Sequence, residues 1–395
     1  MVLMRRRGSW GAILPVVAVL VTVLGLMSAY QALFRDAPYP IPITDFGRDL
    51  LGARAAQLGI NPYQTVGDLA AAIPDSGIPT EASDLWVAHS PLSIAVARLW
   101  LTVAGPDLAE DIAEFVQGLS LVLLLGGVWL FGARTWSHWH GLLLASATAL
   151  TLGFRLDAFY IQGASLVALG LFLVLLMERQ SWRTGGLLLL GGLVAWRPWL
   201  APMALVLPRS ASGTRDGVQV ALTATLATLL VLPWIGGWQS VTSWVFEALP
   251  ANLEFYSAYE WNMSPSGPSL SAAAGSVLYL AATLLLPSQR GRWISESWPV
   301  LGAAVILALT PLVWSHYWLA LTIVLLYLAR VRSFPLVVVT VLVMAWPLAS
   351  SSPQMTRVSS YLAVALLIVT LFAKSTPGVD DQAPPIQEGP IETEG

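Results

Sequence analysis

Charged residues are scarce in this chain, and two residue types are missing or nearly so. Asp, Glu, Lys and Arg make up only 11% of the 395 residues. Cysteine is absent, which excludes a disulfide framework and any metal site with a cysteine ligand. The formal net charge of −3 is too small to indicate a nucleic-acid partner. Lysine occurs once, at Lys374, so arginine carries nearly all of the positive charge, a bias typical of GC-rich bacterial coding sequences.

Apolar residues dominate the chain instead. Hydrophobic residues account for 56% of it, the mean hydropathy is +0.69, and there are 18 tryptophans. A soluble protein would need an enormous core to bury this much apolar surface, whereas a membrane protein exposes it to lipid. The composition and the series of long apolar runs therefore predict an all-α polytopic membrane protein.

The first apolar run extends from about Trp10 to Tyr30 and follows the basic sequence MRRRGSW. A secretory signal peptide would have a shorter apolar region, followed by a small-residue cleavage site. This run has close to full bilayer length, and no such site is evident. We expect an uncleaved membrane-spanning helix with Arg5–Arg7 in the cytoplasm. Residues 31–90 then form an external loop.

Arginines in the later short loops decide the predicted topology. Placing these loops in the cytoplasm satisfies the positive-inside rule at every one of them. The run 90–105 is then an external helix along the membrane surface. The run GGLLLLGGLVAWRPWLAPMALVL then enters the membrane from the cytoplasmic side and returns to it as two half-helices, broken at Arg197-Pro198. The alternative topology makes 90–105 a membrane span and places Arg179 and Arg183 outside. We favour the topology in which 90–105 does not cross the membrane. The loop arginines are Arg134, Arg179, Arg183, Arg209, Arg215, Arg290, Arg292, Arg330 and Arg332.

A single membrane domain is predicted for residues 1–374. It contains about 11–12 transmembrane helices, some of them half-helices, together with external helices beside the membrane. A second external loop is expected at 238–272. The stretch 375–395 is acidic and rich in proline, without an apolar period, so we expect a disordered cytoplasmic tail. Both termini are expected in the cytoplasm.

Unusual polar residues gather on the external side of this topology. Charged groups close to a bilayer usually line a cavity or a site, so five separated segments are predicted to converge there. These segments carry Asp45, Arg48, Arg155, Asp157, Gln162, Arg197, Asn262 and His316.

The segment TDFGRDLLGARAAQLGINPY predicts a helix along the external membrane surface. Thr44 or Asp45 can cap a helix that begins at Phe46. Arg48 and Asp49 are expected to point away from its apolar face. Asp45 has two interpretations: a helix cap, or a catalytic base that faces a substrate carried in the lipid. The apolar face is expected to contain Phe46, Leu50, Leu51 and Leu58.

Four stretches, taken in order and spacing, resemble one protein family. They are TDFGRDLLGARAAQLGINPY, VAHSPLSIAVARL, IQGASLVALGLFLVLLMERQSWRTGGLLLLGGLVAWRPWLAPMAL and TPLVWSHYWLAL, and they span most of residues 44–321. The family comprises membrane glycosyltransferases that use polyprenyl-phosphate sugars, and it includes mycobacterial phosphatidylinositol-mannoside mannosyltransferases and arabinofuranosyltransferases. The resemblance implies a GT-C type fold in the bacterial cytoplasmic membrane, with the active site on the external face.

The chain departs from the family pattern at four places. Ser90-Pro91 stands in place of a proline pair, and Gly163-Ala164 follows Gln162 where the family has asparagine. Arg197 stands where lysine is common, and Tyr317 replaces a second histidine. These departures affect the fold little, but they leave the identity of the sugar open.

The resemblance implies an inverting transfer of a mannosyl or arabinofuranosyl unit from a polyprenyl-phosphate sugar to a glycolipid or lipid-linked glycan. Asp45 would take the acceptor's proton as general base. Arg48, Arg155 and Arg197 are candidates to hold the departing phosphate, since guanidinium binds phosphate through two N–H groups. His316 would donate to that phosphate or orient the acceptor. Further candidate pocket residues are Gln162, Asn262, Trp314, Tyr317, Tyr63 and His89.

No cofactor is expected, because the lipid phosphate is itself the leaving group, and no metal is expected, because no acidic pair has a metal-like spacing. The protein is expected to act as a monomer on lipid substrates, without nucleic acid. Other classes stay open at this point: a transporter or flippase of a lipid or glycolipid, a structural subunit of an envelope assembly, and a polysaccharide ligase or polymerase.

Structural roles also compete for individual residues. Arg197 can pair with an acid such as Asp157, and Arg48 and Arg155 can anchor the chain at the interface. The histidines of TWSHWH, at 138 and 140, are expected to be interfacial rather than metal ligands.

Overall fold

The computed structural model describes five stretches of the chain and four separate residues. The regular elements in these stretches are helices, and an isolated bridge joins Thr65 to Trp86. The described residues are 10–34, 43–73, 84–179, 182–203 and 214–257, with Gly302, Ile306, Tyr317 and Leu319. The predicted site residues Asn262, Trp314 and His316, and the predicted tail 375–395, lie outside them.

Three described helices are long and apolar enough to cross a membrane. They are α1 (Trp10–Phe34), α5 (Pro106–Thr135) and α11 (Thr214–Val231), and their apolar stretches have 21, 28 and 20 residues. A span needs about 20 residues. α6 (His138–Ala149) and α7 (Leu152–Tyr160) meet at a bend of 56° and form a candidate fourth span. The prediction of an all-α membrane protein is confirmed for this part of the chain, while the GT-C fold and the total number of spans stay predictions.

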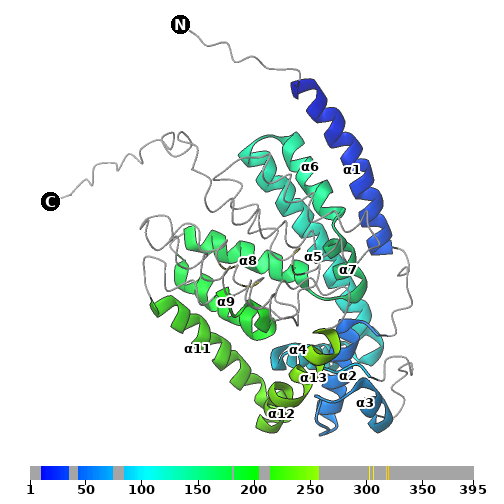
Figure 1. The fold of residues 1–395 in the computed structure, drawn as a ribbon, viewed down its shortest axis with the longest axis vertical. Coiled ribbons are helices and arrows are strands. Elements are labelled where there is room, and N and C mark those ends of the chain that lie inside the picture. The colour runs from blue at the N-terminus through cyan, green and yellow to red at the C-terminus, as the bar shows by residue number, and fades with distance from the viewer. Residues whose placement is uncertain are drawn as a thin grey trace, which may run out of the picture.

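α1 and α5 run in opposite directions (Figure 1). The hydroxyl of Thr44, ten residues after the end of α1, donates to Glu110 Oε1 in the first turns of α5 at 2.9 Å. Leu33, near the end of α1, lies beside Gly118 of α5, where an added Cβ would lie 3.8 Å from Leu33 Cδ2. With 30 residues, α5 is about 45 Å long, so Thr135 lies at the opposite end of this helix.

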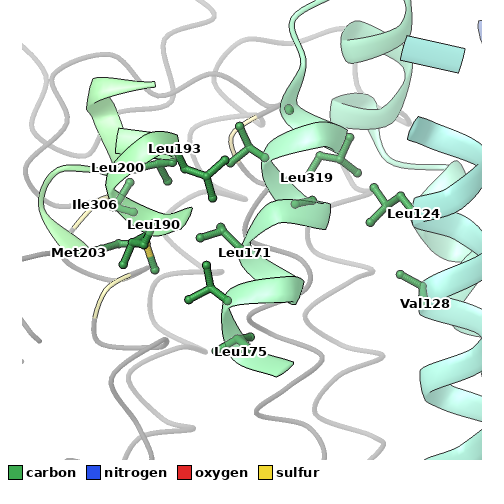
Figure 2. Close-up of a cluster of buried hydrophobic side chains, with 14 of the residues drawn as sticks. Leu124, Val128, Leu171, Leu175, Leu190, Leu193, Leu200, Met203, Ile306 and Leu319 are labelled. Carbon is green, nitrogen blue, oxygen red and sulfur yellow. The ribbon is translucent and has the colours of Figure 1, made fainter. Parts of the chain in front are cut away.

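Apolar side chains, most of them from α5 and the two helices α8 (Ala164–Arg179) and α9 (Arg183–Trp196), form the core of the bundle. α8 lies between α5 and α9, as Figure 2 shows. Small residues allow the closest helix contacts: a Cβ added to Gly141 of α6 would lie 2.3 Å from the carbonyl oxygen of Trp129 on α5. The buried residues labelled in Figure 2 are Leu124, Val128, Leu171, Leu175, Leu190, Leu193, Leu200, Met203, Ile306 and Leu319.

α9 ends at the predicted break. Arg197 is its C-cap, with φ −127° and ψ 85°, and Pro198 begins a short 3-10 helix, η2 (Pro198–Leu200). A proline disfavours the α conformation in the residue before it and has no N–H to continue the helix. The expected break at Arg197-Pro198 is therefore confirmed; the return of the chain falls in 204–213, outside the described residues.

Short helices gather at the end of the bundle where α5 begins, and we call this group the cap (Figure 1). They enclose a second apolar core, separate from that of the bundle, around Tyr63, Leu69, Ile94 and Ile235. The cap consists of α2 (Asp45–Gln57), α3 (Val66–Ala72), α4 (Pro91–Ala104), α12 (Trp238–Ser243), a π-helix (Trp244–Ala248) and α13 (Leu249–Ser257).

The cap joins the two segments that were predicted to be external loops. Asn61 Nδ2 donates to Ser243 Oγ at 3.0 Å, and Trp244 Nε1 donates to the carbonyl of Ala88 at 3.0 Å. The 14 residues of α4 fall short of a full span, and α4 packs against α2 within the cap; the topology stays a prediction.

Candidate functional site

Thr44 caps α2. Its hydroxyl accepts a hydrogen bond from the backbone N–H of Gly47 at 2.8 Å, while it also donates to Glu110 on α5. The helix therefore begins at Asp45, one residue before the expected start at Phe46. Asp45 was interpreted either as a helix cap or as a catalytic base. The structure gives the capping role to Thr44.

Asp45 forms an ion pair with Arg48 one turn further along α2. Both side chains are mostly buried, with 15% and 11% of their surface exposed. Arg48 also donates from Nη1 to the carbonyl of Trp86 at 3.3 Å, which ties α2 to the segment that precedes α4. This pair brings together two of the predicted site residues.

Asp49 forms a second pair, with His89. The distance from Asp49 Oδ1 to His89 Nδ1 is 2.8 Å, and the Asp49 side chain is only 5% exposed. The expectation that Asp49 points away from the buried face of α2 is wrong, and Leu58, expected on that face, is 56% exposed beyond the end of the helix. The buried side of α2 is partly polar because it faces other charged groups, so apolar spacing alone misplaced it.

Arg197 approaches this pair from the end of α9. Its Nη2 donates to the carbonyl of Gln162 at 2.5 Å, and its guanidinium carbon lies 4.9 Å from the centre of the Trp196 ring. Gly163 permits this contact: its φ is +72°, and an added Cβ would lie 3.0 Å from Trp196 Cη2 and 3.5 Å from Arg197 Nη2. Glycine alone combines this backbone conformation with enough space.

Ser90 fixes the position of His89 relative to Arg197. It caps α4, and its hydroxyl donates to the carbonyl of Trp196 at 2.8 Å; Ser93 donates to the same carbonyl at 3.3 Å. We call this pair of hydrogen bonds the serine clasp. Since His89 precedes Ser90 and Arg197 follows Trp196, the clasp holds the segments that carry these two candidate site residues together. Ser90, which stands where the resembled family has proline, thus has a structural role that sequence reasoning missed.

Electrostatic interactions join these groups into one cluster. The charge of Asp49 acts on His89, Tyr63 and Arg197, and the charge of Arg197 acts on His89 and Tyr317. The Tyr317 ring stacks on Trp199 of η2, with centroids 4.2 Å apart and an interplanar angle of 11°. The cluster therefore lies where the cap meets the broken end of α9.

Burial shifts the titration of two cap residues in the cluster. Burial lowers the pKa of His89 from its ordinary value; Asp49 opposes this shift, and Arg197 and Arg48 add to it. Burial, followed by the charge of Asp49, raises the pKa of Tyr63 well above its ordinary value. At neutral pH the imidazole is therefore uncharged, and the phenol keeps its proton.

Several buried polar atoms of the cluster lack a hydrogen-bond partner among the described residues. They are Tyr63 Oη, Arg48 Nε and Gln162 Oε1. Leaving a buried donor or acceptor unpaired costs about 1–3 kcal/mol, so these atoms favour a polar ligand at this position.

Asp157 has a structural role in holding the bundle together. Its carboxylate accepts hydrogen bonds from the backbone N–H groups of Ala164 at 2.7 Å and Ser165 at 2.9 Å, and from Gln117 Nε2 at 2.5 Å. It therefore caps the start of α8 and links it to α5. The described contacts include no ion pair between Asp157 and Arg197, although their charges interact.

The remaining predicted residues lie elsewhere or outside the described stretches. Arg155 is on α7, and no described hydrogen bond joins its side chain to the cluster; its buried Nε has no partner there. His140 bonds to Ser137 Oγ at 2.6 Å, at the start of α6. Within the described stretches, no three His, Asp or Glu side chains converge to hold a metal ion.

The cluster combines a proton acceptor with positive charge and unpaired donors at the edge of a membrane bundle. Asp45 and Asp49 balance Arg48 and Arg197, so the four charges sum to zero, and a ligand with one negative charge finds two guanidinium groups nearby. Such a site can remove a proton from one substrate and hold an anionic group of another. Compared with family models, curated proteins and solved structures, the chain has no match.

Proposed function

We propose that the chain is an inverting glycosyltransferase of the bacterial cytoplasmic membrane. It moves a mannosyl or arabinofuranosyl unit from a polyprenyl-phosphate sugar to a glycolipid or lipid-linked glycan on the external face. One observation carries the proposal: the buried carboxylate of Asp49 pairs with His89 and interacts electrostatically with the guanidinium of Arg197 where the cap meets the membrane helices, and the Asp45–Arg48 pair lies one turn earlier on α2.

This combination suits transfer from a lipid phosphate. The acceptor hydroxyl must lose a proton as its oxygen attacks the anomeric carbon, and a carboxylate or imidazole can accept it. The bond from the anomeric carbon to the phosphate oxygen breaks, and the departing phosphate gains negative charge. Arg197 can stabilise that charge through paired N–H groups.

The position of the cluster suits substrates carried in lipid. The cap lies at one end of the candidate spans α1 and α5, where a phosphate at the membrane surface is within reach of protein groups. Asp45 was predicted from the sequence as the base. The Asp49–His89 pair is a second candidate of the same kind.

Purified protein supplied with polyprenyl-phosphate-mannose or polyprenyl-phosphate-arabinose, and with a panel of glycolipid acceptors, tests the proposal. The expected result is transfer of labelled sugar to one acceptor class, with inversion at the anomeric carbon. Consumption of neither donor by protein that remains folded would exclude this function. Movement of intact glycolipid across vesicles without bond cleavage would favour a flippase instead.

A further inference from the structure

We propose that His89, oriented by Asp49, accepts the proton of the acceptor hydroxyl. This inference rests on the proposed function and assigns a catalytic residue within the same site. It differs from the sequence-based assignment of that role to Asp45.

The geometry of the pair makes His89 a proton acceptor. Asp49 is buried and lies 2.8 Å from Nδ1, so its carboxylate accepts the Nδ1–H of a neutral ring. In that tautomer Nε2 carries the lone pair. The His89 side chain is 26% exposed, which leaves an approach to the ring that Asp49 lacks.

Burial is the main cause of the lowered pKa that keeps this imidazole neutral, and charges from several elements act on it in both directions. Arg48 of α2 and Arg197 beyond α9 face His89 with positive charge, and Asp49 faces it with negative charge. Two tyrosines border the group: Tyr63 beside Asp49 and Tyr317 beside Arg197. When the proton arrives, the imidazolium is compensated by Asp49 and by the additional charge on the departing phosphate.

Asp45 is less suited to this task. Its carboxylate is engaged by Arg48, and a neighbouring cation favours the charged form of a carboxylate and so weakens it as a base. Arg48 in turn bonds to the carbonyl of Trp86, three residues before His89. Asp45 thus acts on the segment that carries His89, which makes it a positioning residue.

The step balances without a co-reactant. An oxygen lone pair of the acceptor forms the new bond to the anomeric carbon, and the electron pair of the old bond leaves with the phosphate oxygen. The hydroxyl proton moves to Nε2 of His89, which later releases it to water. Nothing is oxidised or reduced.

Variants of the pair test the proposal in purified full-length protein. His89→Gln is expected to lower kcat by about 100- to 10,000-fold, the usual contribution of a general base, with little change in KM for the donor. Asp49→Asn is expected to lower kcat less and to alter the pH profile, because an amide can favour the other tautomer. His138→Gln, which removes an exposed histidine of α6, is the matched control and should keep wild-type activity.

A spectroscopic measurement separates orientation from folding. In ¹⁵N-histidine NMR, the signal that disappears in His89→Gln is expected to report the Nδ1–H tautomer in the wild type and to change in Asp49→Asn. Imidazole added to His89→Gly should restore part of the transfer. Restored activity would exclude a purely structural loss.

The outcomes distinguish the two proposals. If the wild type transfers sugar and folded His89→Gln keeps a fifth or more of its kcat, the assignment of His89 is overturned and the glycosyltransferase function stands. If Asp45→Asn abolishes transfer and His89→Gln does not, Asp45 is the base. If the wild type transfers no sugar, the proposed function fails, and the His89 assignment fails with it.

Discussion

Replacing Arg197 by alanine should have two effects: weaker binding of the lipid donor and a shifted pH dependence of sugar transfer. The guanidinium is placed to bind phosphate, and a hydrogen bond to a charged group contributes about 1.5–3 kcal/mol. Its loss corresponds to a roughly 10- to 150-fold rise in KM for the donor. Arg197 also contributes to the lowered pKa of His89. Without its charge the pKa of His89 rises, so the acidic limb of the kcat profile moves to higher pH.

Steady-state transfer between about pH 5 and 8, a range that brackets the ordinary pKa of histidine, measures both effects. Arg197→Lys keeps the charge and should restore the position of the acidic limb, with partial recovery of KM. Part of the alanine effect will be on stability, because the carbonyl of Gln162 loses its donor. Arg183→Ala, which breaks the ion pair with the buried Asp216 on α11, is the control for such a loss and should leave the donor KM unchanged. An Arg197→Ala variant with a lower Tm but an unaltered KM and pH profile would refute the phosphate-binding role.

Other expected outcomes follow from the cap and its contacts. Ser90→Ala removes the α4 cap and the stronger bond of the serine clasp and should lower stability by about 1–3 kcal/mol, measured by unfolding in detergent, whereas Ser90→Thr keeps the hydroxyl and should lose less. Tyr63→Phe removes a buried hydroxyl that has no hydrogen-bond partner among the described residues, so Tm should hold or rise. Transfer should fall roughly tenfold if that hydroxyl contacts substrate, and unchanged transfer would show that it does not. In intact cells, a cysteine at Thr135 should be shielded from an impermeant thiol reagent and one at exposed Asp68 should react, because α5 separates them; the reverse pattern would contradict an external cap.

The sequence was sufficient to predict the elements governed by local rules. Apolar runs of bilayer length predicted helices such as α1 and α5, and the proline at 198 predicted the end of α9. The two possible caps, Thr44 or Asp45, predicted the start of α2 to within one residue. These outcomes depend on neighbouring residues along the chain.

Features that depend on contacts between distant segments could not be predicted. Asp49 was placed on the outer side of α2 because apolar spacing assumes an apolar interior, and the partner that reverses this, His89, lies 40 residues away. Asp45 and Asp49 are four residues apart on α2, and residues at this spacing lie on the same face of a helix. This spacing was the signal that could have placed both carboxylates on the same side of α2. Ser90 gave no sign of its bond to Trp196, which lies 106 residues further along the chain.

The serine clasp has a consequence for how the protein responds to heat. Ser90 and Ser93 both bond to the carbonyl of Trp196, so this contact between cap and bundle also sets the separation of His89 and Arg197. The bundle holds its own apolar core, which does not depend on this contact. Local opening requires less free energy than global unfolding. Warming should therefore release the clasp first, and activity should disappear reversibly several degrees below the temperature at which the membrane helices come apart.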